Sequence, residues 1–146
     1  MLVITGLQGY YQFHLLKANH PTFALLTVIV YLFTETLIIF FFVGTGVSIK
    51  EFTLQQKANP RFHQKSIAIK QKIYPPTLLN ILLVMILFIT GGAVDTGGLP
   101  GWAHGTLFLL VMGHFLYTLR IQHNCFRENT SLILEMVAPK DPACTT

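Results

Sequence analysis

The chain has 146 residues, of which 52% are hydrophobic and only 11% are charged. Soluble domains carry about 25% charged residues, so this composition excludes an ordinary soluble domain and indicates a membrane protein. The formal net charge of +4 does not indicate a nucleic-acid-binding protein, because the basic residues cluster beside apolar segments. The two cysteines, Cys125 and Cys144, give neither a disulfide framework nor a CxxC metal spacing.

The first segment, residues 1–19, mixes apolar and polar side chains. Gly6 and Gly9 interrupt it, and Tyr10 and Tyr11 add aromatic rings with polar ends. It is shorter and more polar than a membrane span, so we predict a segment that lies on the membrane surface or against a partner. A loosely ordered tail is the alternative.

The first membrane span is predicted over residues 21–46. His20 and the proline after it open this span, since proline is tolerated in the first turn of a helix. Glu35 is the only charged residue between the proline and the glycines that end the apolar run. Residues 47–75 then carry six Lys or Arg residues and one acidic residue, and we predict a basic loop there.

Two further spans are predicted over residues 76–93 and 102–122. Asn80 is the one strongly polar residue of the second span, and we interpret it as a hydrogen-bonding contact to a neighbouring helix. The loop between the spans is short and rich in glycine, so the two helices form an antiparallel hairpin. In the third span, Trp102 suits one membrane surface and the Arg120 side chain reaches the other.

The distribution of basic residues predicts the orientation of the single membrane domain, residues 1–146. Six Lys or Arg residues lie in 45–75 and three follow Leu119, whereas Lys17 alone lies on the opposite side. Basic residues favour the cytoplasmic side, so we predict an outer N-terminus and a cytoplasmic tail over 124–146. The membrane is then a bacterial inner membrane or an organellar inner membrane, where matrix or stroma replaces cytoplasm.

Histidines fall at three depths in this arrangement. The layers are His20 with His104 at the outer surface, His114 with Glu35 near the middle, and His63 with His123 at the inner surface. An ionisable side chain inside a membrane segment is costly and indicates a functional site, so His114 is the first candidate. A b-type haem is held in a membrane by histidines from facing helices, and one pair per leaflet would give an electron path across the bilayer.

This layout resembles the membrane-bound di-haem cytochromes b and the haem-anchor subunits of succinate dehydrogenases. The resemblance covers about His20 to His123 and rests on the motifs HP at the first span, FHQK in the loop, and AHG and GHF in the third span. It implies haem b, and also quinone, as cofactors, with His20, His104, His114, His63 and His123 as cofactor-binding residues. In those families the ligands usually lie within the helices of a four-helix bundle, whereas here His20 precedes a proline and His63 is expected in a loop.

Simpler interpretations stay open for each of these residues. Histidines at a membrane surface can act as interfacial anchors without any ligand, and His104 can orient the start of its helix. Glu35 can be a neutral carboxyl group that hydrogen-bonds a neighbouring helix, a proton carrier, a contact for quinol, or a metal ligand. A membrane oxidoreductase with a His/Glu metal centre would use His104, His114 and Glu35.

We therefore predict an all-α integral membrane protein with three transmembrane helices and flanking interfacial amphipathic segments. The predicted function is that of a small subunit of a respiratory or photosynthetic electron-transfer complex, with other membrane subunits and the lipid bilayer as partners and with no activity alone. The alternatives are a cofactor-free accessory subunit and a component of a proton or cation transporter. Glu35 and His114 lie at similar depths on separate spans, so we also predict that they meet, directly or through water or a ligand.

Overall fold

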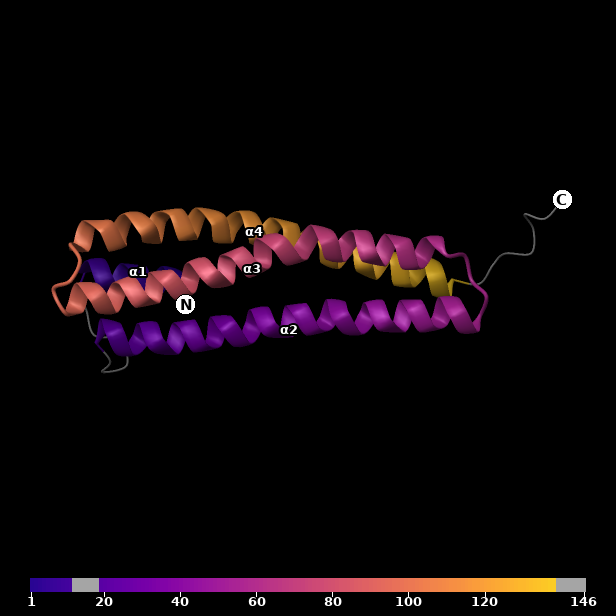
Figure 1. Cartoon of the computed structure of the whole chain (residues 1–146), viewed down its shortest axis with the longest axis horizontal. Helices are drawn as coiled ribbons and strands as arrows, with labels where there is room; N and C mark the ends of the chain where they lie inside the picture. Colours follow the sequence, from indigo (N-terminus) through magenta and orange to yellow (C-terminus); the bar gives the residue numbers. More distant parts are fainter. Residues whose placement is uncertain (12–18, 139–146) are drawn as a thin grey trace.

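The computed structural model describes residues 1–11 and 19–138, and all regular structure within them is α-helical. Four helices follow one another along the chain: α1 (Leu2–Tyr11), α2 (His20–Gln55), α3 (Arg61–Asp95) and α4 (Gly101–Val137). The three long helices run side by side in alternating directions, and α1 lies at the end of the bundle where α2 begins (Figure 1). The prediction of an all-α fold is confirmed.

Helices α2, α3 and α4 are each long and apolar enough to cross a membrane, as predicted. Large exposed apolar side chains surround the half of the bundle that contains α1, and on α4 they run from Trp102 to Leu119. That stretch is about 26 Å long at ~1.5 Å per residue, close to the ~30 Å hydrocarbon core of a bilayer. We call residues 20–38, 76–95 and 101–122 the membrane half, and residues 39–55, 61–75 and 123–137 the basic half.

The segment 47–75, predicted as a basic loop, is mostly helical, and only residues 56–60 connect α2 to α3. Its apolar side chains explain the difference. Ile49 of α2 packs in one buried cluster with Ile69 and Ile73 of α3, so the two helices keep a shared core beyond the membrane half. The many lysines between these apolar residues occupy the outer faces of the same helices, which is why a count of charges alone indicates a loop.

Two other boundaries also differ from those predicted. Pro75 and Pro76 lie inside α3 instead of at the start of a separate span. Proline lacks a backbone N–H, so two carbonyl groups of the preceding turn lose their helical partners at this point. The predicted tail over 124–146 forms the last part of α4 as far as Val137, and residues 139–146 lie outside the described residues.

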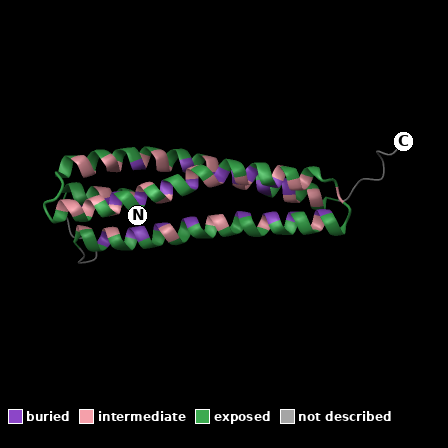
Figure 2. Ribbon diagram, in the orientation of Figure 1, coloured by how far each residue is buried: buried purple, intermediate pink, exposed green. Residues whose placement is uncertain are grey.

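Buried positions recur at intervals of three and four residues along each long helix. On α3 they are Ser66, Ile69, Ile73, Thr77, Asn80, Val84 and Leu87. This mean spacing of about 3.5 residues is typical of helices that cross at a shallow angle in left-handed bundles. Figure 2 shows buried residues as a stripe within otherwise exposed helices, so each long helix has one inward face.

The inward faces form two apolar clusters. The cluster in the membrane half contains Val28, Tyr31, Val84, Leu87 and Val111. The cluster in the basic half contains Phe42, Ile49, Ile69, Ile73, Cys125 and Leu132. Polar side chains occupy the bundle between the two clusters.

Helix α1 is the described part of the predicted interfacial segment, and it packs on the start of α2. The hydroxyl groups of Thr5 in α1 and Thr27 in α2 are hydrogen-bonded at 2.8 Å. A Cβ on Gly6 would overlap the Phe108 ring of α4, so a glycine is needed where α1 approaches that ring. Residues 12–18, including Lys17, lie outside the described residues.

Candidate functional site: a polar layer and a histidine pair

A layer of polar side chains lies between the two apolar clusters. Its members come from all three long helices: Tyr31 and Glu35 from α2, Thr77 and Asn80 from α3, and His114, Thr118 and Gln122 from α4. His114 is half-buried and the others are buried. Each polar group left without a partner inside a membrane destabilises the fold by roughly several kcal/mol. The hydrogen bonds within this layer offset that cost.

His114 is fixed to α3 through one ring nitrogen. Its Nδ1 lies 2.9 Å from the Asn80 Oδ1 and 3.4 Å from the Thr118 Oγ1. The Nδ2 of Asn80 donates in turn to the hydroxyl group of Tyr31. Since the amide oxygen of Asn80 can only accept, the proton lies on Nδ1 of His114, and Nε2 is left as an acceptor.

Glu35 joins α2 to α4. The Nε2 of Gln122 donates to the Glu35 Oε2 at 2.6 Å and also reaches the Thr77 Oγ1 at 3.3 Å. Tyr31 lies one turn before Glu35 on the same face of α2, and both side chains are buried. All three long helices therefore contribute to the surroundings of one buried acid.

The predicted meeting of Glu35 and His114 takes an indirect form. Among the described residues, no hydrogen bond joins their side chains, but Asn80 bonds both His114 and Tyr31, which lies one turn before Glu35. Glu35 lies level with Gln122, which is about 12 Å further along α4 than His114 at ~1.5 Å per residue. The estimate of equal depth is inaccurate because α2 and α4 do not begin at the same level.

His20, at the start of α2, and His104, near the start of α4, both lie at the α1 end of the bundle. The His104 Nδ1 lies 3.1 Å from the hydroxyl oxygen of Thr90, and its ring rests on Gly91, where a Cβ would come within 3.2 Å. The His20 ring rests in the same way on Gly9 of α1, and its buried Nδ1 has no hydrogen-bond partner. The structure thus places both histidines of this predicted layer at one end of the bundle.

The tautomer of His104 follows from the bonds of Thr90. The hydroxyl group of Thr90 donates its one proton to the backbone carbonyl oxygen of Leu87. It must therefore accept from Nδ1–H of His104, and Nε2 of this ring is left as the basic nitrogen. Metal-bound histidines usually show this pattern, in which a second group holds one ring nitrogen and thereby orients the other.

The predicted layer of His63 and His123 is not brought together. His63 lies in α3, with its Nδ1 buried and without a hydrogen-bond partner, whereas His123 is exposed on α4. The neighbour of His123, Gln122, lies level with Thr77, and residue 63 is about 20 Å further along α3 at ~1.5 Å per residue. These two histidines are therefore too far apart to share one ligand.

The predicted metal set of His104, His114 and Glu35 is not assembled either. No group of three or more His, Cys, Asp or Glu side chains that could hold a metal ion occurs in residues 1–11 and 19–138. The physical reason is that α3 holds the two histidines at different levels, through Thr90 and through Asn80.

Sequence reasoning missed Gln122 and underestimated Tyr31. Gln122 follows Arg120, the charge that marks the predicted end of the apolar run, so it gives no signal of membrane burial. The spacing between Tyr31 and Glu35 is one helical turn and indicates a shared face, but it does not identify the partner on another helix.

The chain matches no known family model, no curated protein and no solved structure. A functional assignment for this chain therefore rests on the geometry of the polar layer and of the histidine pair.

Proposed function

We propose that this chain is a small integral membrane subunit of a larger electron-transfer complex, and that His20 and His104 bind a b-type haem or a quinol at the α1 end. The observation that carries the proposal is the arrangement of this pair. Two histidines from separate helices lie at the same end of the bundle, and His104 is held through Nδ1 with Nε2 available. A quinol can be hydrogen-bonded by such a nitrogen, and haem iron can be ligated by it.

The residues at the α1 end suit haem better than a bare metal ion. Haem iron needs two axial protein ligands, whereas a structural or catalytic zinc ion needs three or four. The unpartnered Nδ1 of His20 supports a ligand beside these rings, and the two glycines, Gly9 and Gly91, give the imidazole rings room against α1 and α3. When bound, the haem would supply one-electron transfer, and this chain would supply two ligands and their orientation.

A partner subunit is part of this proposal because the bundle has little free space of its own. Val28, Val84 and Val111 fill the core of the membrane half between the three helices. A haem or quinol therefore belongs at the rim of the bundle, between this chain and a neighbour. Exposed Trp102, which is 75% accessible, marks such a rim at the α1 end.

The proposal is tested by purifying the chain in mild detergent with the proteins that accompany it and recording a reduced-minus-oxidised spectrum. We expect a b-type spectrum, with part of it lost in His20→Ala and in His104→Ala. His123→Ala is the matched control, because this exposed histidine has no partner and should leave the spectrum unchanged. If neither a b-type spectrum nor bound quinone accompanies the complex, or if both signals persist in the two variants, the chain is a cofactor-free accessory subunit.

A second candidate, proton or cation transport, is favoured by the connected polar layer. Asn80 is hydrogen-bonded to Tyr31, and Glu35 lies one turn further along α2, inside the bundle. The amide group of Asn80 does not pass protons readily, so a proton path needs water beside it. Passive proton flux into liposomes that falls in Glu35→Gln, while the haem spectrum stays absent, would favour this function over electron transfer.

A further inference from the structure

Lys70 of α3 lies directly against the backbone of α2. A Cβ on Gly46 would overlap the ammonium group of Lys70 and would come within 3.2 Å of the Ser66 Oγ. The ammonium and hydroxyl groups therefore converge on one patch of α2 that carries no side chain. We call Gly46, Ser66 and Lys70 the Lys70 site.

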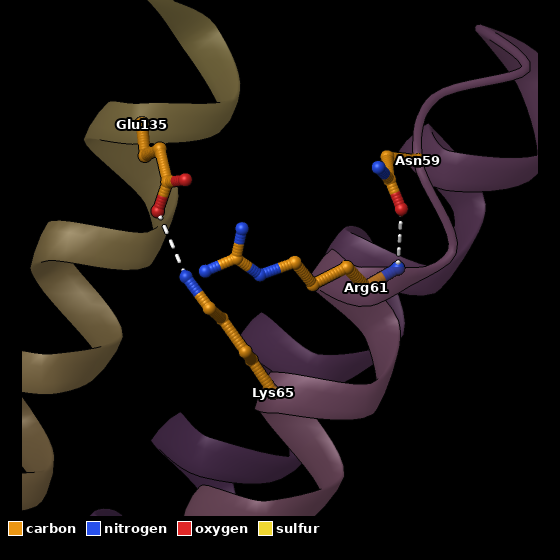
Figure 3. Close-up of polar contacts among 4 residues, drawn as sticks. All are labelled: Asn59, Arg61, Lys65 and Glu135. Carbon is orange, nitrogen blue, oxygen red and sulfur yellow. Dashed lines mark hydrogen bonds and ion pairs between the residues drawn. The ribbon is translucent and has the colours of Figure 1, made fainter.

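The charge of Lys70 differs from that of its neighbours on α3 in having no acidic partner. Lys65 forms an ion pair with Glu135 at 3.0 Å, and Figure 3 shows this pair with the side chain of Arg61 extending toward it. Lys72 forms an ion pair with Glu128 at 2.6 Å. Within the described residues these are the two ion pairs, so two lysines of α3 are paired with acids of α4 and Lys70 is not.

The nearest acidic residue along α2 does not supply the missing charge. Glu51 lies five positions after Gly46, about 140° further round the helix at ~100° per residue. It is exposed and forms no ion pair with a described residue. The ammonium group of Lys70 thus keeps an uncompensated positive charge beside the buried hydroxyl group of Ser66.

The depth of the Lys70 site matches the phosphate level of a bilayer. On α3 the apolar span begins after Pro75, and Lys70 lies about 8 Å further out at ~1.5 Å per residue. The headgroup region extends about 5–8 Å beyond each side of the hydrocarbon core. On α2 the exposed apolar residues continue to Val47 beside the site, so an acyl chain has an apolar surface to follow.

From these observations we propose that the Lys70 site binds the phosphate of an anionic phospholipid headgroup. The ammonium group of Lys70 donates hydrogen bonds to the phosphate oxygens, and the glycine at position 46 gives the end of the Lys70 side chain its place against α2. The site is independent of the histidine pair at the opposite end.

The test compares phospholipid retained by the purified full chain, measured by native mass spectrometry after exchange into phosphatidylglycerol or phosphatidylcholine. Wild type should retain phosphatidylglycerol preferentially, and Lys70→Gln should lower that retention about fivefold, the effect of one lysine near an anionic surface. Lys70→Arg should retain most of it. Gly46→Ala should also lower it, because the new methyl group displaces only the flexible end of Lys70 and leaves the bundle folded.

Lys72→Gln is the matched control, because Lys72 lies on the same helix at nearly the same depth but is paired with Glu128. Less than a twofold loss is expected for it. Equal losses in Lys70→Gln and Lys72→Gln would show that the basic half attracts lipid only through its general charge, and would overturn the proposal. Retention of inorganic phosphate without any preference for phosphatidylglycerol would also overturn it, since the bound group would then be a free anion.

Discussion

Both halves of the bundle bury an apolar cluster, and they differ in their outer faces and in the polar groups that each interior holds. In the membrane half, Asn80 and Glu35 are fully or almost fully buried, while Leu109 is 70% exposed. In the basic half, Phe42 is 1% exposed, and Lys65 lies at the surface in an ion pair. The three helices run without interruption through both halves, so the change from an apolar to a charged outer face occurs within each helix.

The comparison shows that two properties of the helix contacts have separate causes. One is which face of each helix points inward, and the other is which kinds of side chain that face carries. Both halves use the same spacing of three and four residues, which fixes which face points inward. The surroundings then decide what that face contains. Lipid does not drive apolar side chains together, so in the membrane half the hydrogen-bonded polar layer adds to the packing of Val28, Val84 and Val111. Water drives apolar residues into the core of the basic half.

The two halves are predicted to end on opposite sides of the membrane, and cysteine labelling tests this difference most sharply. Native Cys125 is fully buried and Cys144 lies outside the described residues, so neither reports topology well. In a variant with both changed to Ser, an exposed Ser131→Cys should react with an impermeant thiol reagent only after the cells are opened. Thr96→Cys should react in intact cells. The reverse pattern would invert the predicted orientation.

The largest loss of stability is expected in the core of the basic half. Phe42→Ala removes a buried ring and should lower the free energy of unfolding by about 3–5 kcal/mol, through lost burial and the cavity left behind. Thermal or denaturant unfolding in micelles, followed by circular dichroism, measures this. Phe40→Ala is the control, because this ring is 66% exposed and its loss should have little effect. Equal effects would mean that the basic half has no packed core.

A smaller loss is expected from one polar residue of the membrane half. Asn80→Leu removes the bonds to Tyr31 and His114 and leaves two polar groups without their partner. The expected cost is about 1–3 kcal/mol, measured by the same unfolding experiment. An unchanged or raised stability would show that the polar layer does not hold the helices together.

The smallest effect is expected at the surface of the basic half. Lys65→Gln breaks the ion pair with Glu135, whose two side chains are 37% and 51% exposed. Exposed pairs contribute less than about 1 kcal/mol, and salt screens them. The loss should vanish at high salt concentration, whereas a loss that persists would indicate a packing role for the lysine stem.

Much of the membrane half could be predicted from the sequence because its signals are local. Apolar stretches gave the three spans, and the polar exceptions Glu35, Asn80 and His114 all proved to belong to one layer. The partners could not be predicted, since the relative heights of α2 and α4 depend on packing across the bundle. Gln122 lies opposite Glu35 for that reason, although the sequence places it past the end of the apolar run.

The basic half was harder to predict for a different physical reason. Its lysines outnumber its apolar residues on the outer faces, and the inward Ile69 and Ile73 are visible only once a helical period is assumed. The histidines show the same limit. The pairing of His20 with His104 followed from membrane depth, whereas His63 and His123 lie at different levels because α3 extends far beyond the membrane half.

The most direct test of the connected polar layer is a double-mutant cycle on Glu35→Gln and His114→Ala, measured as unfolding free energy in micelles. The two side chains make no direct hydrogen bond in the described residues, so coupling is expected through Tyr31, one turn from Glu35, and through Asn80, which bonds Tyr31 and His114. The expected result is a coupling energy of at least about 0.5 kcal/mol, with the double variant less damaged than the sum of the single variants. The coupling should vanish when Asn80 is replaced by Leu. Strictly additive effects in the native background would contradict a connected layer and leave Glu35 and His114 as two separate contacts.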